Sequence, residues 1–118
     1  MTTRSTAPIL TRIRKLCLAF PDATEKLSHG TPCFFAGQGS KARCFAMWAD
    51  NHHDDGRLAV WVAATKVVQH AQVTARPEQF FVPPYVGPRG WLGVRLDRKL
   101  AWDEIARVLE DAFLLVAR

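Results

Sequence analysis

The sequence predicts an α+β fold, a single compact domain over residues 1–118 in which an antiparallel sheet of about five strands packs with an N-terminal and a C-terminal helix. Two observations carry this prediction. Apolar residues recur at helical spacing near both ends of the chain, and between them short apolar segments are separated by turn residues. Strands that follow one another through short turns pair antiparallel, which excludes the alternating strand–helix order of a nucleotide-binding fold.

Helical periodicity defines the two terminal helices. Residues 101–117 carry the clearest apolar stripe, and Asp103 suits the positive N-terminal end of that helix. Residues 7–18 carry a second stripe, with Thr6 placed to cap it. A weaker pattern predicts a short third helix at 65–75.

Turn residues divide the middle of the chain into strands. Gly30-Thr31-Pro32 and Gly37-Gln38-Gly39-Ser40 are breaks, and residues 50–56 form a polar hairpin loop. A further segment, 80–96, returns to the sheet after this region. The four strands expected before it are 25–28, 33–36, 43–49 and 57–63.

The segment 80–96 combines a rigid loop with a two-faced strand. Pro83 and Pro84 have no amide donor and a fixed φ, so a central strand cannot run through them. Residues 87–90 read as a turn. The alternation that follows places two sets of side chains on opposite faces of the strand. Leu92, Val94 and Leu96 form a core face, and Trp91, Gly93 and Arg95 form a face that we expect to look onto accessible space.

Bulk composition bounds the class of protein. A chain of 118 residues that is 48% apolar supports one domain with its own core, and a net charge of +5 favours an acidic partner. No segment resembles a signal peptide or a membrane span, so we expect a soluble cytoplasmic protein without a membrane partner. Cys17, Cys33 and Cys44 are odd in number and lack C-x-x-C spacing, which predicts free thiols rather than disulfides or structural zinc.

Five short motifs along the chain point to a known family. They are Gly30-Thr31-Pro32-Cys33-Phe34, Phe45-Ala46, the run from Pro77 to Trp91, Gly93-Val94-Arg95-Leu96-Asp97 and Trp102-Asp103-Glu104. With these motifs the chain resembles the MmcQ/YjbR family over nearly its full length. It departs from that family at Val62-Ala63-Ala64, where relatives often carry a lysine.

The resemblance implies a compact α+β domain whose two lobes are similar to a double-wing DNA-binding arrangement. Members of the family are commonly described as DNA-binding on that likeness, and no catalytic residue comes with it. Because a fold does not fix a function, the residues themselves have to argue for a site.

The first functional hypothesis is a non-catalytic binding module for DNA. Arginines on or beside the sheet would contact phosphates, and a tryptophan would stack on bases. The alternative for the same face is a covering helix, with the tryptophans building core. The residues expected to bind nucleic acid are Arg43, Arg57, Arg89, Trp91 and Arg95.

The second hypothesis places a small anionic ligand or a protein partner on the Pro83–Trp91 loop. A loop stiffened by prolines loses little entropy on binding. Tyr85, Arg89 and Trp61 are the residues expected to contact the ligand. The alternative is a structural role, in which Phe80 and Phe81 anchor the loop and the prolines only stiffen it.

Catalysis and metal binding have little support. Residues 50–55 contain His and Asp side chains, but neighbours on a hairpin tip point in different directions, so a solvated turn is expected. His29 reads as a turn residue, and Cys33 and Cys44 lack an evident base. No known catalytic motif occurs. We therefore expect no catalytic residue, no metal and no cofactor.

Overall fold

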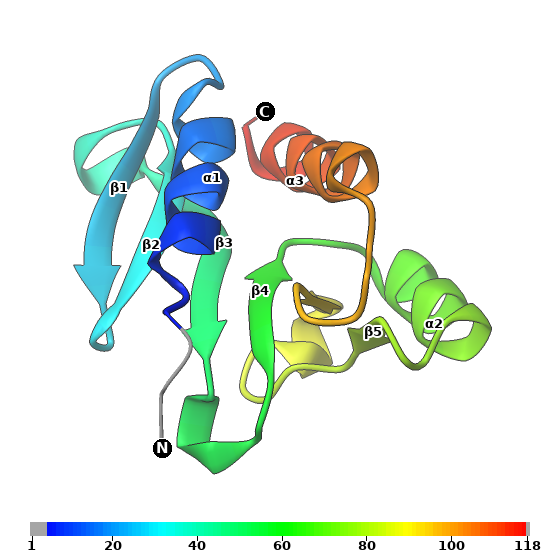
Figure 1. The fold of residues 1–118 in the computed structure, drawn as a ribbon. Coiled ribbons are helices and arrows are strands. Elements are labelled where there is room, and N and C mark those ends of the chain that lie inside the picture. The colour runs from blue at the N-terminus through cyan, green and yellow to red at the C-terminus, as the bar shows by residue number, and fades with distance from the viewer. Residues whose placement is uncertain (1–4, 118) are drawn as a thin grey trace.

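The structure, a computed structural model that describes residues 5–117, is built on a six-stranded antiparallel sheet in the order β1-β2-β3-β4-β6-β5 (Figure 1). The α+β class is confirmed. The sheet has one strand more than expected because the segment 80–96 contributes two, on either side of the proline loop. The strands are β1 (Ala23–Ser28), β2 (Thr31–Ala36), β3 (Arg43–Asp50), β4 (Leu58–Val62), β5 (Phe80–Phe81) and β6 (Leu92–Arg95).

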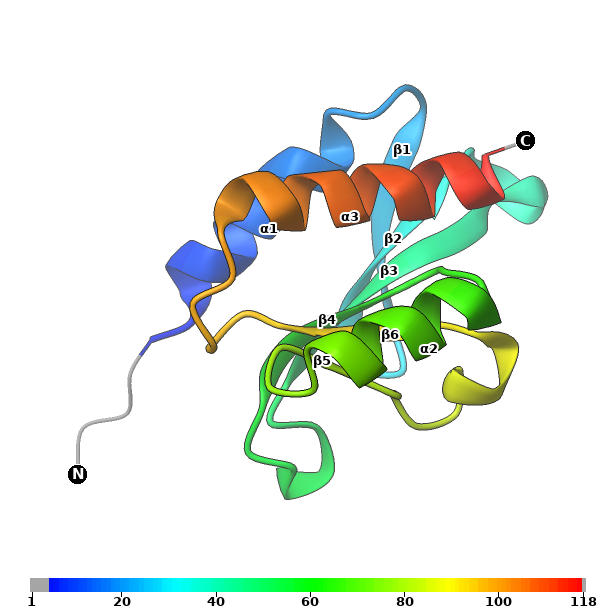
Figure 2. The ribbon, with the colours of Figure 1, turned by 90° about the vertical axis from the view of Figure 1, so that its right-hand side faces the viewer.

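Two of the three helices in the described residues cover one face of the sheet. α1 (Ala7–Leu18) packs against β1 and α3, and α3 (Trp102–Val116) packs against β2, β3 and β4. Figure 2 shows these two helices on one side of the sheet. α2 (Lys66–Ala75) packs against β5, the strand at the end of the sheet. Both terminal helices therefore lie where the sequence predicts them. None of the described helices has the length and apolar character that crossing a membrane requires.

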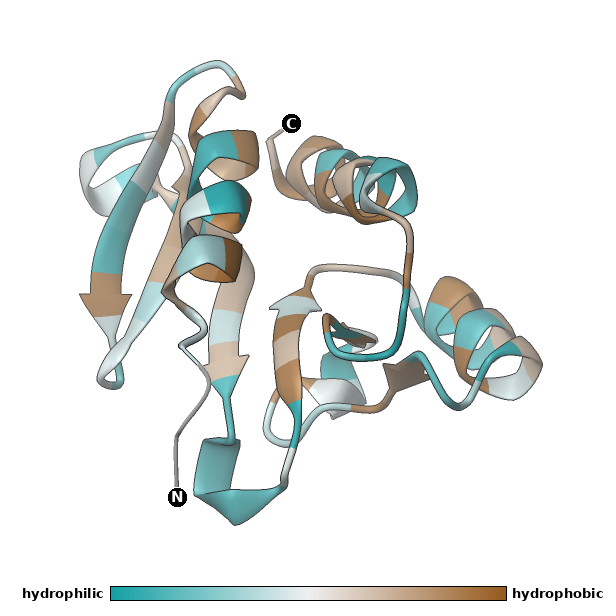
Figure 3. Ribbon diagram, viewed as in Figure 1, coloured by the Kyte–Doolittle hydropathy of each residue, from teal (hydrophilic) through white to brown (hydrophobic). Residues whose placement is uncertain are grey.

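Aromatic rings fill the space between α1, α3 and the sheet. Phe20 stacks on Phe113 with ring centroids 4.8 Å apart, and Phe45 meets Phe113 edge-on at 5.4 Å. Ile13 and Cys17 of α1 are fully buried beside them. In Figure 3, β4 is largely hydrophobic whereas the loop that precedes it is hydrophilic. All five residues of β4 are buried, so both faces of this strand are covered.

A β-bulge interrupts the pairing of β2 and β3. Phe34 pairs with Ala46, but Phe35 pairs with Cys44, which leaves Phe45 as an extra residue on β3. Phe45 and Ala46 are both fully buried. The bulge thus places two consecutive residues of β3 in the core and changes which side chains share the opposite face.

The face of β6 that was expected to be open is filled. Trp91 is only 4% exposed, so its ring does not look onto accessible space as predicted. Gly93 does not leave room for a ligand either. A Cβ at Gly93 would lie 2.5–2.6 Å from three atoms of the Phe81 ring, which occupies that space. The prediction was wrong because alternation separates two faces of a strand but does not reveal what covers each.

We expect Gly93→Ala to lower the free energy of unfolding by about 1–3 kcal/mol, because the added methyl group would displace the Phe81 ring. Urea denaturation measures the loss. Phe81→Leu removes the ring, so adding Gly93→Ala to that variant should cost little more. Fully additive losses in this double-mutant cycle would contradict the account of the packing.

Candidate functional site

A cleft of about 1010 Å³ lies beside the C-terminal half of β3. Residues from segments far apart in the sequence line it: 28–32 in the β1–β2 turn, 47–50 and 52–53 at the end of β3 and in the loop after it, Trp61 of β4, and residues 85, 86 and 89. The three residues predicted for a loop-centred ligand site, Tyr85, Arg89 and Trp61, all line this cleft.

Each of these three residues presents a different chemical group to the cleft. The Tyr85 side chain is largely in solvent, with the residue 70% exposed, and its hydroxyl lies 3.1 Å from Nε2 of His53. The Arg89 guanidinium has no carboxylate partner among residues 5–117 and lies 5.7 Å from the centroid of Trp91. Trp61 is 5% exposed and lines the cleft.

Histidines of the β3–β4 loop cover Trp61. The His52 ring meets the indole edge-on at 4.9 Å, and His53 lies 4.2 Å from His52. Two buried atoms here, Nε1 of Trp61 and Nε2 of His52, have no hydrogen-bond partner among the described residues. An unsatisfied buried polar group costs about 1–3 kcal/mol, and a bound acceptor would remove that cost for the indole N–H. This histidine pair was not predicted, because the polar loop was expected to be solvated.

Strained backbone surrounds the same cleft. Positive φ angles hold His29 at 56°, His53 at 50° and Tyr85 at 66°, and all three line the cleft. Asn51 and Asp54 of the adjoining loop are also in the left-handed region, at 53° and 61°. Such conformations are unfavourable for residues with a Cβ, and they cluster at functional sites, where surrounding structure fixes them.

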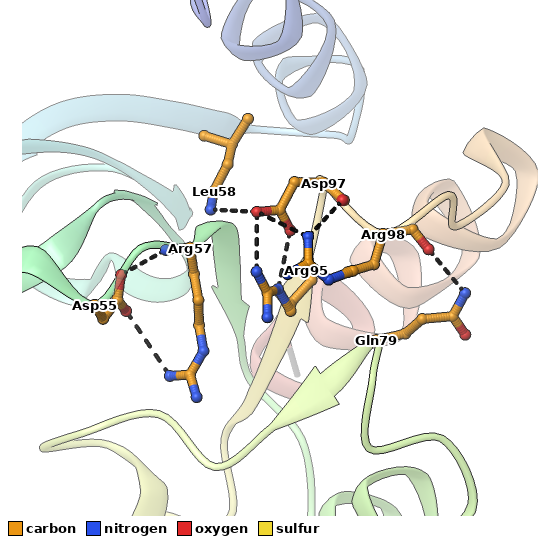
Figure 4. Close-up of polar contacts among 7 residues, drawn as sticks. All are labelled: Asp55, Arg57, Leu58, Gln79, Arg95, Asp97 and Arg98. Atoms are coloured by element: carbon orange, nitrogen blue, oxygen red, sulfur yellow. Dashed lines mark hydrogen bonds and ion pairs between the residues drawn. The ribbon is translucent and has the colours of Figure 1, made fainter.

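The arginines predicted to contact phosphates are mostly engaged elsewhere. Figure 4 shows Asp97 accepting from Arg95 at Nε (2.9 Å) and Nη2 (3.1 Å) and from the amide of Leu58 (3.2 Å). Arg57 pairs with Asp55 at 3.8 Å and stacks 4.0 Å over the Phe81 ring. These two arginines therefore serve internal contacts.

The remaining three predicted residues do not gather on one surface. Arg43 is exposed, has no ion-pair partner among the described residues, and lines a second depression of about 480 Å³ together with Lys41. Arg89 lines the main cleft instead. Trp91 is buried, and its carbonyl accepts from Gln69 Nε2 of α2 at 2.6 Å, so its expected stacking role does not fit this structure.

The fold and the cleft define a small α+β domain with a preformed concave site. A family model described as YjbR matches residues 18–115, and the chain belongs to this family. The resemblance found in the sequence is thus confirmed. The comparison with curated proteins gave no match.

A solved structure supports the same fold. The crystal structure of Deinococcus radiodurans protein DR2400, which carries the family-model domain DUF419, is similar to this chain with a TM-score of 0.79 and 21% identity. The match covers 92% of this chain and 78% of DR2400. At this identity the likeness concerns the fold alone.

Asp97 is the carboxylate with the largest set of partners around β4. Burial raises its pKa, but the hydrogen bonds from Arg95 and Leu58 and the charges of Arg95 and Arg98 outweigh burial, and the net pKa lies below the ordinary value. The carboxylate form is therefore stabilised by folding.

We expect Asp97→Asn to lower the free energy of unfolding at neutral pH by about 1–3 kcal/mol, as loss of a hydrogen-bonded charge does. A carboxylate with a depressed folded-state pKa contributes fully above its unfolded pKa of about 4. That contribution is lost as the pH falls through the folded pKa, so the difference between wild type and variant should shrink in acid. Chemical denaturation over a pH series measures it.

The matched control is Asp111→Asn, which alters an exposed carboxylate on α3. Its effect should be small at every pH. A difference between wild type and Asp97→Asn that stays constant down to strong acid would show that Asp97 acts through shape rather than charge.

Proposed function

We propose that this YjbR-family protein is a non-catalytic binding module whose cleft takes a small anionic ligand with a planar apolar body, such as an aromatic carboxylate. The observation that supports this most is the meeting of Tyr85, Arg89 and Trp61 in one cleft. They come from a loop and a strand more than twenty residues apart, and each matches one requirement of such a ligand.

Charge argues for an anion. Arg89 offers up to five donors and has no carboxylate neighbour among the described residues. Asp50, which also lines the cleft, is engaged by the hydroxyl of Thr6 at 2.7 Å. A guanidinium binds carboxylate or phosphate through charge-assisted, often bidentate hydrogen bonds.

Shape and rigidity argue for a flat body. The rings of Trp61, His52 and Tyr85 meet edge-to-face at one side of the cleft, which gives it an aromatic wall. The loop that carries Tyr85 and Arg89 is fixed by Gln69, whose amide donates to the carbonyls of Gly87 and Trp91 at 2.9 and 2.6 Å. A preformed site of this kind loses little conformational entropy on binding.

The position of the family motifs is a further support. Two segments on which the family resemblance rests, 30–34 and 77–91, both contribute residues to the cleft. They lie on opposite sides of β3 and β4 in the sequence. A ligand site formed by both segments would give a role to both motifs. A purely structural role of the proline loop would give a role only to the motif at 77–91.

A thermal-shift screen of small carboxylates and phosphates tests the proposal. A ligand at one hundred times its Kd should stabilise the protein by about 2.7 kcal/mol. Arg89→Gln should weaken binding by roughly 10–100-fold, the equivalent of a charged hydrogen bond. Arg43→Gln removes an arginine outside the cleft and should leave affinity unchanged. No stabilisation by any planar anion, or equal losses in both variants, would refute the proposal.

A second candidate is DNA binding, which the net charge of +5 and the arginines at 43 and 89 favour. Because Arg57 and Arg95 are held by Asp55 and Asp97, phosphate contacts would fall to the remaining cations. Binding of this kind would be weak and independent of base sequence.

Titration of labelled duplex DNA over a salt series tests this second candidate. If Arg43 and Arg89 each neutralise one phosphate, log affinity should fall with log salt at a slope of about −2. Replacing either arginine by Gln should reduce the slope by about one phosphate contact. Absence of binding at low salt, or a slope unaffected by both substitutions, would exclude this mode.

A further inference from the structure

Three sulfur-containing side chains share one face of β2 and β3. Cys33 pairs directly with Met47, and Cys44 pairs with Phe35. Cys33 and Phe35 are two residues apart on one strand and therefore face the same way. Cross-strand partners also share a face. The pairing thus places Cys33, Cys44 and Met47 on a common face, opposite to the face that α1 and α3 cover.

The bulge at Phe45 creates this arrangement. In a regular strand Cys44 and Met47, three residues apart, would point to opposite faces. The extra residue turns Phe45 and Ala46 together into the core, so Cys44 and Met47 become successive residues on the other face. Alternation read from the sequence would have separated these two sulfurs.

The two thiols are neighbours on this face. Cys33 and Cys44 lie diagonally across the β2–β3 pair, since Cys44 is opposite Phe35, two residues along β2 from Cys33. The Cys33 thiol donates to the Ser28 carbonyl at 3.8 Å, and the Cys44 thiol donates to the Ala46 carbonyl at 3.5 Å. Cys33 is 1% exposed, whereas Cys44 and Met47 are partly exposed. A small ion can approach this group from the Cys44 and Met47 side.

We propose that Cys33, Cys44 and Met47 form a binding site for a single Cu(I) ion. Thiolate and thioether are the ligands that soft Cu(I) selects over harder ions. Among residues 5–117 no group of three His, Cys, Asp or Glu side chains could hold a metal ion, so a harder ion lacks the ligands it needs. With metal–sulfur bonds of about 2.3 Å, the sulfurs of a trigonal site stand about 4 Å apart, a spacing within reach of side chains that are neighbours across two paired strands.

The charge balance of the site is also accounted for. Two thiols that bind Cu(I) release two protons and leave a complex with one negative charge. Lys26 pairs with Cys33 from the β1 side, so its side chain lies on the same face. Its ammonium group lies 4.5 Å over the Phe35 ring, next to Cys44 in the pairing. A lysine here compensates the anionic copper site. The inference does not depend on the anion cleft, although Met47 borders both.

Anaerobic titration of the reduced full chain with Cu(I), in competition with the chelator bicinchoninate, tests the site. We expect one Cu(I) per chain. Cys33→Ser and Cys44→Ser should each weaken binding by more than about 100-fold, and Met47→Leu by roughly 10-fold or more, since even outer partners of a metal contribute 10–100-fold. Circular dichroism verifies that each variant folds.

Cys17→Ala is the matched control. This thiol is buried in α1 against the helix side of the core, and burial raises the pKa of Cys17 to about 12. Its loss should leave copper affinity unchanged. Met47→Leu conserves volume at a partly exposed position and keeps the test decisive if a serine variant misfolds. Retention of all copper by the chelator, one copper per two chains, or an equal loss in Cys17→Ala would overturn the proposal.

Discussion

Complete burial of β4 is the constraint on which the rest of this structure depends. Every residue of the strand is shielded, so each of its two faces requires a cover. α3 covers one face, whereas the ring of His52 lies against Trp61 on the other. That second cover is assembled from a polar loop, through His52, and from the rigid segment between β5 and β6. The cleft is the space that this composite cover leaves.

The same constraint explains the ion pairs beside β4. Asp97 joins the first residue of β4 to the end of β6, and Arg57 extends over Phe81 of β5. Charged side chains that are engaged in these contacts between strands are poorly placed to serve an external partner. Arg89 differs because it stands on the cover itself, where no carboxylate lies beside it among the described residues.

Much of the fold could be predicted from the sequence. The terminal helices followed from stripes with helical period, and four strands followed from the spacing of turns. Three features could not be predicted, because each depends on contacts between residues distant in the sequence. They are the position of β6 between β4 and β5, the bulge at Phe45 and the burial of Trp91. One available signal was missed: each of the pairs Asp55–Arg57 and Arg95–Asp97 joins opposite charges only two residues apart in the sequence.

The candidate site was foreseen only in part. The rigid loop predicted a ligand site at Tyr85, Arg89 and Trp61, and these three residues do line one cleft. The contribution of His52 and His53 depends on left-handed backbone at Asn51 and His53, which no periodicity reveals. The sulfur group was hidden for a related reason, since one inserted residue reverses the facing of Cys44 relative to Met47.

The most direct test of the central claim, that the cover of β4 forms an anion site, is a ¹H–¹⁵N NMR titration with benzoate. The chain has four tryptophans, and each gives a separate indole signal. The account predicts that the Trp61 indole signal moves progressively to saturation, while that of Trp102, which lies against Arg12 on α1, stays in place. An unmoved Trp61 signal at high benzoate, or equal movement of both, would contradict the account.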